Sequence, residues 1–196
     1  MAYYCKEEPL YRYGTIIRSF LPERAALLLL IPGVGVRYVV FARFPHTIFS
    51  VGMTIRFVSR TKASGVLVIS DISFEQTAAD WAGSDLLFVH HLCELCQRFV
   101  FTDEDAGAVF TLMQELYQSL TYEEDVELKK LAMLSKFFIL LGHYAPPLPA
   151  LDGGADAGEA TELARQKKRT IKQWLRACIC ACEPAYALKT IHFLTT

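Results

Sequence analysis

The chain has 196 residues, of which 53% are hydrophobic, which is enough to bury one substantial core or two modest ones and excludes disorder for most of its length. No stretch reaches the roughly 18 consecutive apolar residues of a membrane helix, and the first residues lack the apolar segment of a secretion signal. We therefore expect a cytoplasmic protein. Because the cytoplasm is reducing, its six cysteines are expected to be free thiols. The net charge of −1 conceals two basic zones around an acidic one: residues 9–70 carry a net +7, residues 71–162 a net −13 and residues 163–196 a net +6.

Five short β-rich runs follow one another in the first basic zone, separated by Pro, Gly and Ser. They are predicted to be strands over residues 14–20, 24–31, 36–44, 53–60 and 65–74. Five strands in about sixty residues, with no helix between them, are typical of a small closed barrel. We therefore expect an α+β chain, in which an N-terminal five-stranded OB-type β-barrel (residues 1–76) precedes an all-helical domain (residues 77–196).

The cations of this predicted barrel indicate a polyanion-binding surface. Alternation along the fourth strand places its apolar residues inward and its two arginines outward. In the third strand Arg37 and Arg43 share a face with Val39 and Phe41, a mixture of cations and aromatic surface that suits nucleic acid. The alternative is a solvated surface with no such role. The predicted DNA-binding residues are Arg18, Arg37, Arg43, Arg56, Arg60 and Lys62.

After residue 75 the apolar period lengthens to about 3.6, which predicts helices. The predicted helices cover residues 84–101, 103–120, 123–141 and 161–182, with a short last helix at 185–194. Thr102 is the expected cap of the second helix, and the first three helices are expected to pack as one bundle. Residues 146–160 have the composition of a flexible linker within the helical domain.

The helix predicted at residues 161–182 has one basic face and one apolar face. At 100° per residue its cations fall within an arc of about 80°, and its apolar residues, including Trp174 and Leu175, fall within another arc of about 100°. The helix therefore docks through one side and offers the other to an acidic partner, to DNA, or to the acids of the bundle. The residues assigned to partner binding are Arg165, Lys168, Arg169, Lys172, Trp174 and Arg176.

The cysteines and histidines predict core packing rather than a metal site. Residues 90–96 contain two histidines and a CxxC pair within one helix, which provides no second pair of ligands at a fixed distance. Cys178, Cys180 and Cys182 have the wrong spacing for a zinc knuckle; a site shared between the two cysteine groups is the alternative. No motif of a hydrolase, nucleotide-binding loop or metalloprotease occurs. We expect no metal, no cofactor and no catalytic residue.

The order of these elements resembles the RecO family of bacterial DNA repair and recombination mediators. Residues 91–95 take the place of that family's Tyr-Leu-x-Glu-Leu core, and residues 137–146 take the place of its signature ending in Leu-Gly-Tyr-x-Pro. The likeness covers roughly residues 10–147, and its order of elements is more specific than any one motif. Two departures stand out: the linker lacks the four zinc-binding cysteines of many members, and residues 41–46 are shorter and less basic than the family's loop.

The resemblance implies a non-enzymatic adaptor that binds single- and double-stranded DNA, anneals strands and loads recombinase. It also implies two protein partners, a RecR-like protein and the acidic C-terminal tail of single-stranded-DNA-binding protein, and a place at the nucleoid. The alternative is a protein–protein scaffold built on an OB-type barrel, whose arginines serve solubility. The two readings differ in the salt dependence of DNA binding, because phosphate contacts weaken steeply as salt rises.

Overall fold

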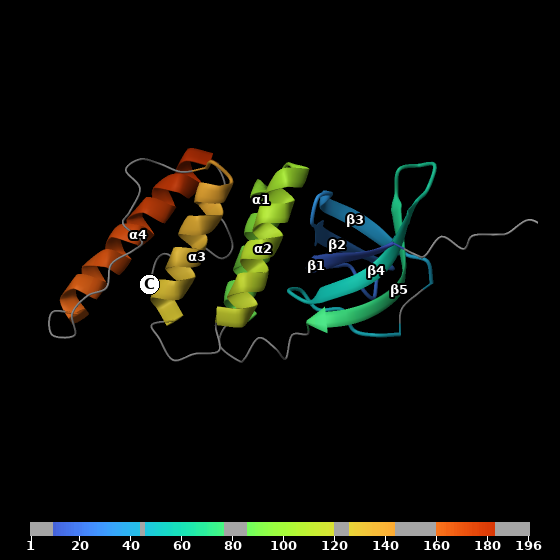
Figure 1. Cartoon of the computed structure of the whole chain (residues 1–196), viewed down its shortest axis with the longest axis horizontal. Coiled ribbons are helices and arrows are strands. Elements are labelled where there is room, and N and C mark those ends of the chain that lie inside the picture. Colours follow the sequence, from blue (N-terminus) through green and yellow to red (C-terminus); the bar gives the residue numbers. More distant parts are fainter. Residues whose placement is uncertain (1–9, 44–45, 77–85, 120–125, 144–159, 183–196) are drawn as a thin grey trace, which may run out of the picture. The chain divides into compact units, whose positions relative to one another are not determined.

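A computed structural model describes residues 10–43, 46–76, 86–119, 126–143 and 160–182 (Figure 1). Its elements are β1 (Tyr11–Ser19), β2 (Ala26–Ile31), β3 (Gly35–Phe41), β4 (Thr54–Thr61), β5 (Leu67–Gln76), α1 (Leu86–Phe99), α2 (Asp103–Ser119), α3 (Val126–Leu140) and α4 (Ala160–Cys182). The predicted α+β fold, a five-stranded barrel followed by helices, is confirmed. The predicted linker, up to residue 159, and the predicted last helix lie outside the described residues.

The five strands close into a barrel in the order β1-β2-β3-β5-β4. Neighbouring strands are antiparallel except for β3 and β5, which run parallel with Val39 opposite Leu67 and Phe41 opposite Ile69. The antiparallel pairing of β1 with β4 completes the ring. A Greek-key barrel closed in this way is of the OB type, and closure leaves no long strand edge unpaired.

The barrel interior is filled by large aliphatic and aromatic side chains. Those at most 1% exposed are Ile16, Leu27, Leu29, Ile31, Val39, Ile55, Phe57 and Ile69. Val39 and Phe41 belong to this core, so the mixed cationic and apolar outer face predicted for the third strand is wrong. Alternation identifies residues that share a face, but it does not say which face is inside. Arg37, two residues before Val39, nevertheless reaches solvent.

Helix α1 packs on β1. The thiol of Cys93 donates to the carbonyl oxygen of Ile16 at 3.8 Å, and Ile17 is 4% exposed. On the same strand Thr15 is fully buried, and its hydroxyl bonds that of Thr54 on β4 at 3.2 Å. The first of the predicted bundle helices therefore packs against the barrel, a contact that the helical periodicity did not indicate.

Two compact units divide the chain, residues 1–110 and 111–196, with the boundary inside α2. The domain boundary predicted after residue 76 adjoins residues 77–85, outside the described part, and stays a prediction. Helix α2 begins as predicted: the Asp105 amide donates to Thr102 Oγ1 at 3.0 Å, and the Thr102 amide donates to Asp105 Oδ2 at 3.3 Å. This reciprocal pair caps the helix.

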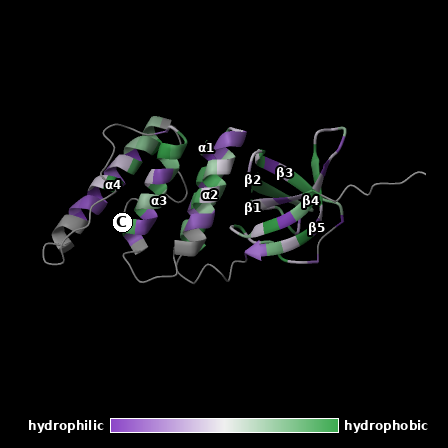
Figure 2. Ribbon diagram, viewed as in Figure 1, coloured by the Kyte–Doolittle hydropathy of each residue, from purple (hydrophilic) through white to green (hydrophobic). Residues whose placement is uncertain are grey.

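In the second unit α3 packs against α4. The apolar arc predicted for α4 is confirmed, since Ile171, Leu175 and Cys178 are at most 1% exposed and Trp174 is 7% exposed. Figure 2 shows α4 hydrophilic along its middle and hydrophobic toward its last described turns. No helix in the described residues combines the length and apolar character needed to span a membrane.

Candidate nucleic-acid interface

An arginine and two tyrosines meet on the outer face where β1 pairs with β4. Tyr13 lies opposite Arg56, and Tyr11 lies opposite Val58, two residues further along each strand. The Arg56 guanidinium carbon is 3.9 Å from the centroid of the Tyr11 ring. Tyr11 and Tyr13 are 41% and 45% exposed. These three residues form the Tyr11–Arg56 patch, in which a stacked cation lies beside two accessible rings.

A second patch of the same composition lies at the other end of β1. Arg18 is opposite Leu28 of β2, which in turn is opposite Tyr38 of β3, so the three lie in one row across the barrel. The Arg18 guanidinium carbon is 5.0 Å from the Phe20 ring centroid, and Phe20 meets Tyr38 edge-on at 5.5 Å between centroids. Tyr38 is 43% exposed. Arg18, Phe20 and Tyr38 form the Arg18–Tyr38 patch.

The buried Thr15–Thr54 contact separates the two patches along β1, because Tyr11 and Tyr13 precede Thr15 and Arg18 follows it. Exposed rings provide flat faces on which bases stack, whatever the base. The neighbouring guanidinium groups bind phosphate oxygens, with strong geometric preference. The arrangement is therefore chemically suited to single-stranded nucleic acid, whose bases and phosphates are both accessible.

Two more of the predicted cations extend this surface. Arg60 is exposed on β4 opposite Val68 of β5, on the strand face that also carries Arg56, as alternation predicted. Lys62 is exposed in the β4–β5 turn, whose bonds run from the Lys62 amide to Val66 O and from the Gly65 amide to Lys62 O, both at 2.9 Å. Gly65, with φ +79°, provides the left-handed residue that this turn needs.

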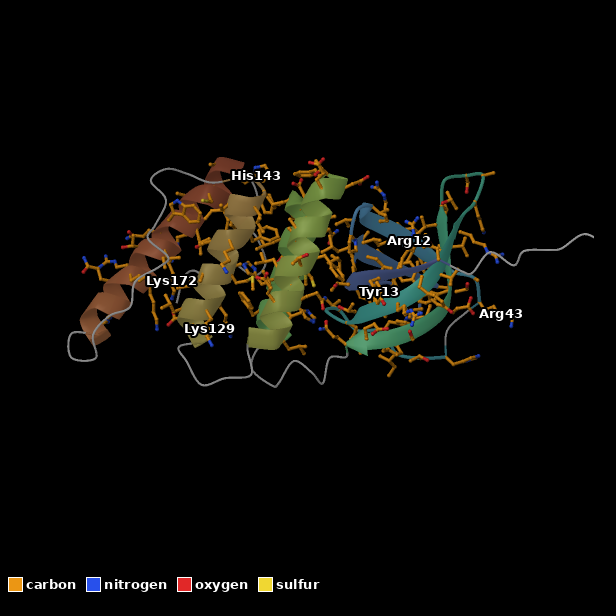
Figure 3. The ribbon with its side chains drawn as sticks, viewed as in Figure 1. Arg12, Tyr13, Arg43, Lys129, His143 and Lys172 are labelled. Carbon is orange, nitrogen blue, oxygen red and sulfur yellow. The ribbon has the colours of Figure 1, made fainter. Side chains whose placement is uncertain are left out.

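Arg37 and Arg43 are not brought together with the other cations. Arg37 Nη2 lies 3.3 Å from Asp103 Oδ1 at the start of α2, so part of its charge is already balanced. Both side chains are about half exposed, which makes this a weak pair that solvent screens. Arg43 follows the end of β3 and lines a separate pocket with Phe41 and Phe49. Figure 3 labels Arg43 and, on the Tyr11–Arg56 patch, Tyr13.

Sequence reasoning missed the aromatic half of both patches. Tyr11 and Tyr13 have the parity opposite to Ile16 of the barrel core, so alternation could have indicated them once the strand was extended to residue 11. Tyr38 has the parity opposite to the buried Val39 and Phe41, and the wrong choice of face on β3 concealed it. Phe20 follows the last residue of β1, and no sequence pattern indicates its contact with Tyr38.

The basic face predicted for α4 is partly neutralised within its own unit. Lys168 Nζ and Lys172 Nζ lie 3.0 and 2.9 Å from the two carboxylate oxygens of Glu127 on α3. Hydrogen bonds from Lys172 and then Lys168 lower the pKa of Glu127. Trp174 is part of the core and offers no apolar pocket to a partner. Of the residues assigned to partner binding, the exposed ones are Arg165, Arg169 and Arg176.

The histidine and cysteine cluster of α1 lies in the core, as predicted. His91, Cys93 and Cys96 are at most 1% exposed, whereas His90 faces solvent. Burial lowers the pKa of His91 to about 4, against a smaller raising effect of Glu94, and burial raises the pKa of Cys93 to about 12. At neutral pH these groups are an uncharged imidazole and unreactive thiols.

Within the described ranges, no three His, Cys, Asp or Glu side chains converge in a way that could hold a metal ion. Cys5 and the side chain of Cys182 fall outside those ranges. No protein-family model matches the sequence, and a search of curated proteins returned no match.

Proposed function

We propose that the protein binds single-stranded DNA on the outer face of its barrel and acts, without catalysis, as a RecO-like recombination mediator in DNA repair. One observation carries the DNA-binding part: two arginine–aromatic patches, Tyr11–Arg56 and Arg18–Tyr38, lie on the outer surface of an OB-type barrel. OB-type barrels commonly bind oligonucleotides on their strand surface. The mediator role, the RecR-like partner and a place at the nucleoid rest on the resemblance alone.

The charge distribution supports the barrel rather than the helices as the DNA-binding part. The barrel's residues 9–70 carry a net +7, and Arg18, Arg60 and Lys62 have no ion pair among the described residues. Two lysines of α4 instead neutralise Glu127. If α4 binds the acidic tail of single-stranded-DNA-binding protein, it does so through Arg165, Arg169 and Arg176, because Trp174 is buried.

Fluorescence anisotropy with a labelled single strand of mixed sequence, measured over a series of salt concentrations, tests the binding. We expect the logarithm of the association constant to fall linearly with the logarithm of salt, with weak dependence on sequence. Annealing of complementary strands coated with single-stranded-DNA-binding protein then tests the mediator role. A protein that does not bind single-stranded DNA at low salt, yet binds protein partners, would instead be a protein–protein scaffold built on an OB-type barrel.

A further inference from the structure

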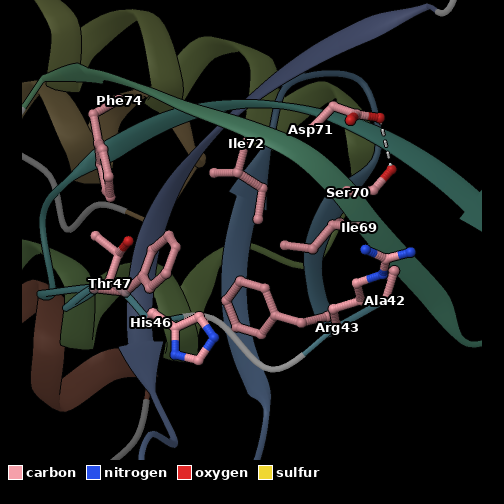
Figure 4. Close-up of a pocket in the computed structure, with 11 residues that line it drawn as sticks. Ala42, Arg43, His46, Thr47, Ile69, Ser70, Asp71, Ile72 and Phe74 are labelled. Atoms are coloured by element: carbon pink, nitrogen blue, oxygen red, sulfur yellow. Dashed lines mark hydrogen bonds between the residues drawn. The ribbon is translucent and has the colours of Figure 1, made fainter.

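A pocket of about 630 Å³ opens beside the connection from β3 to β4, against β5 (Figure 4). Three phenylalanines line it in series: the ring centroids of Phe41 and Phe49 are 5.0 Å apart, and those of Phe49 and Phe74 are 5.3 Å apart. Phe41 and Phe49 are buried, whereas Phe74 is 37% exposed. The pocket therefore has an aromatic lining whose outermost ring is accessible to a flat ligand.

Polar groups stand at the other side of this pocket. Figure 4 shows Arg43, Ser70 and Asp71 together, across from Phe74 and Thr47. The Ser70 hydroxyl donates to Asp71 Oδ2 at 3.0 Å, which holds the carboxylate in place and leaves Oδ1 to accept another bond. Arg43 is exposed and makes no ion pair with a described residue. The imidazole of His46 adds ring nitrogens to the lining, which can donate or accept a hydrogen bond.

Asp71 has an unusual backbone. Its φ of +50° makes it the non-glycine residue in the left-handed region among the described residues. The pairing of β5 with β4 also shifts register between Ser70 and Ser73, so Asp71 lies in a bulge. Bulges re-aim side chains, and local strain of this kind gathers at binding sites. Here the irregularity brings a carboxylate to the rim of an otherwise aromatic pocket.

We propose that this pocket holds one unstacked nucleobase that bears an exocyclic amino group, with the adjoining phosphate on Arg43. The pocket has the size of ordinary small-ligand sites, about 300 to 1,000 Å³. Phe74 stacks on the base, Asp71 accepts from its amino group, and Arg43 pairs with its phosphate. The inference rests on the proposed function where the base belongs to a DNA strand. It adds a preference for bases that bear an amino group, which the two outer patches do not provide.

The carboxylate sets the expected base preference. An ionised Asp only accepts hydrogen bonds, so it favours the amino groups of cytosine, adenine and guanine. Thymine carries carbonyl oxygens on either side of its single ring N–H, and these oxygens repel a carboxylate. A strand of thymine alone should therefore bind through the outer patches but leave the pocket empty.

A single strand of thymine with one central 2-aminopurine reports on the pocket, because stacking on an aromatic ring quenches this base. At saturating protein we expect quenching with the wild type and its loss in Phe74→Leu, with overall affinity reduced about fivefold or less. The matched control is Tyr13→Leu, an exposed ring outside the pocket. It should weaken binding and leave the quenching at saturation unchanged.

Free nucleotides test the same chemistry without a strand. We expect deoxycytidine monophosphate to displace the 2-aminopurine signal at about tenfold lower concentration than thymidine monophosphate, since bonds to charged groups are worth about that much. Asp71→Asn should remove this preference; asparagine tolerates a positive φ, so the fold is retained. Arg43→Gln should weaken both nucleotides, whereas the exposed Arg24→Gln should weaken neither.

The outcomes separate the pocket from the proposed function. Tight binding of the strand with quenching that is unchanged in Phe74→Leu, or equal affinity for the two nucleotides, overturns the pocket and leaves the outer surface standing. A wild type that binds no strand overturns the proposed function. In that case saturable binding of deoxycytidine monophosphate, measured by calorimetry and lost in Arg43→Gln, marks a free-nucleotide site, and its absence overturns the inference as well.

Discussion

The barrel and helix α4 are both rich in positive charge in the sequence, yet they use it in opposite ways. On the barrel Arg18 and Arg56 stack on aromatic rings at the surface. On α4 Lys168 and Lys172 turn toward Glu127 and are only 21% and 18% exposed. The comparison shows that a cation is available to an external partner only where the neighbouring helix or strand places no acid beside it. Net charge alone does not show this.

The two units also differ in how acid should destabilise them, which gives the largest expected effect. Burial holds the pKa of His91 near 4 in the first unit, below its ordinary 6.5. Between these values the unfolded chain binds more protons than the folded one, so stability falls as the pH is lowered from about 6.5 to about 4, by at most about 3 kcal/mol. Hydrogen exchange of barrel amides, followed across this range, measures the loss.

The second unit should respond at lower pH. Lys172 and Lys168 lower the pKa of Glu127, so its contribution is present above the ordinary glutamate pKa of about 4.3 and is lost as the pH falls below it. His91→Gln should flatten the dependence in the first unit, and the exposed His90→Gln should leave it unchanged. Parallel loss of protection in both units near pH 6 would contradict the comparison.

Removing barrel cations should weaken DNA binding far more than removing α4 cations. We expect Arg56→Ala with Arg60→Ala to reduce single-strand affinity tenfold or more near 0.1 M salt and to flatten the salt slope by about one to two units, on all sequences alike. The matched pair is Arg165→Ala with Arg169→Ala, both exposed on α4. Equal losses from the two pairs, measured by anisotropy, would erase the distinction between the surfaces.

The aromatic half of the barrel surface should contribute a smaller, salt-independent share. Replacing Tyr38 by Leu removes an exposed ring of the Arg18–Tyr38 patch, and we expect about a fivefold loss of affinity with the salt slope unchanged. Tyr38→Phe retains the ring and should bind like the wild type. A change in slope with Tyr38→Leu would mean that the ring acts by positioning Arg18 rather than by stacking.

The smallest effect should come from releasing the paired lysines of α4. Glu127→Gln removes the charge that balances Lys168 and Lys172, and we expect a two- to threefold gain in single-strand affinity with a steeper salt slope. The cost in stability is under about 1 kcal/mol, because the carboxylate is half exposed and solvent screens the pair. Unchanged affinity would place α4 away from bound DNA even with its lysines released.

The sequence predicted the elements better than it predicted their contacts. Strand alternation and helical period depend on neighbours a few residues apart, and they located the five strands and four helices of the described residues to within three residues. The ion pair of Arg37 with Asp103 joins residues 66 apart, and that of Lys172 with Glu127 joins two helices. Periodicity carries no information about such partners, so the cations already balanced could not be told from those exposed.

The wrong face on β3 has the same origin. The arginines at 37 and 43 suggested an outward face, but Val39 and Phe41 between them complete the barrel core. The more apolar residues decide which face is inside, and a cation near a strand end can still reach solvent. Reading Tyr38 as the outward residue would have indicated the exposed ring of the Arg18–Tyr38 patch.

The parallel pairing of β3 with β5 has a consequence for the order in which the protein folds. β3 pairs with β5 rather than with its sequence neighbour β4, and β1 pairs with β4 across the ring. The ring of hydrogen bonds therefore cannot close until the chain has been synthesised through residue 76. Until then the β1-β2-β3 meander has two open edges, each available to another nascent chain. Non-local closure of this kind is slow, on the order of milliseconds to seconds. Chaperone protection early in synthesis should therefore matter more for the barrel than for α3 and α4, whose backbone hydrogen bonds lie within each helix.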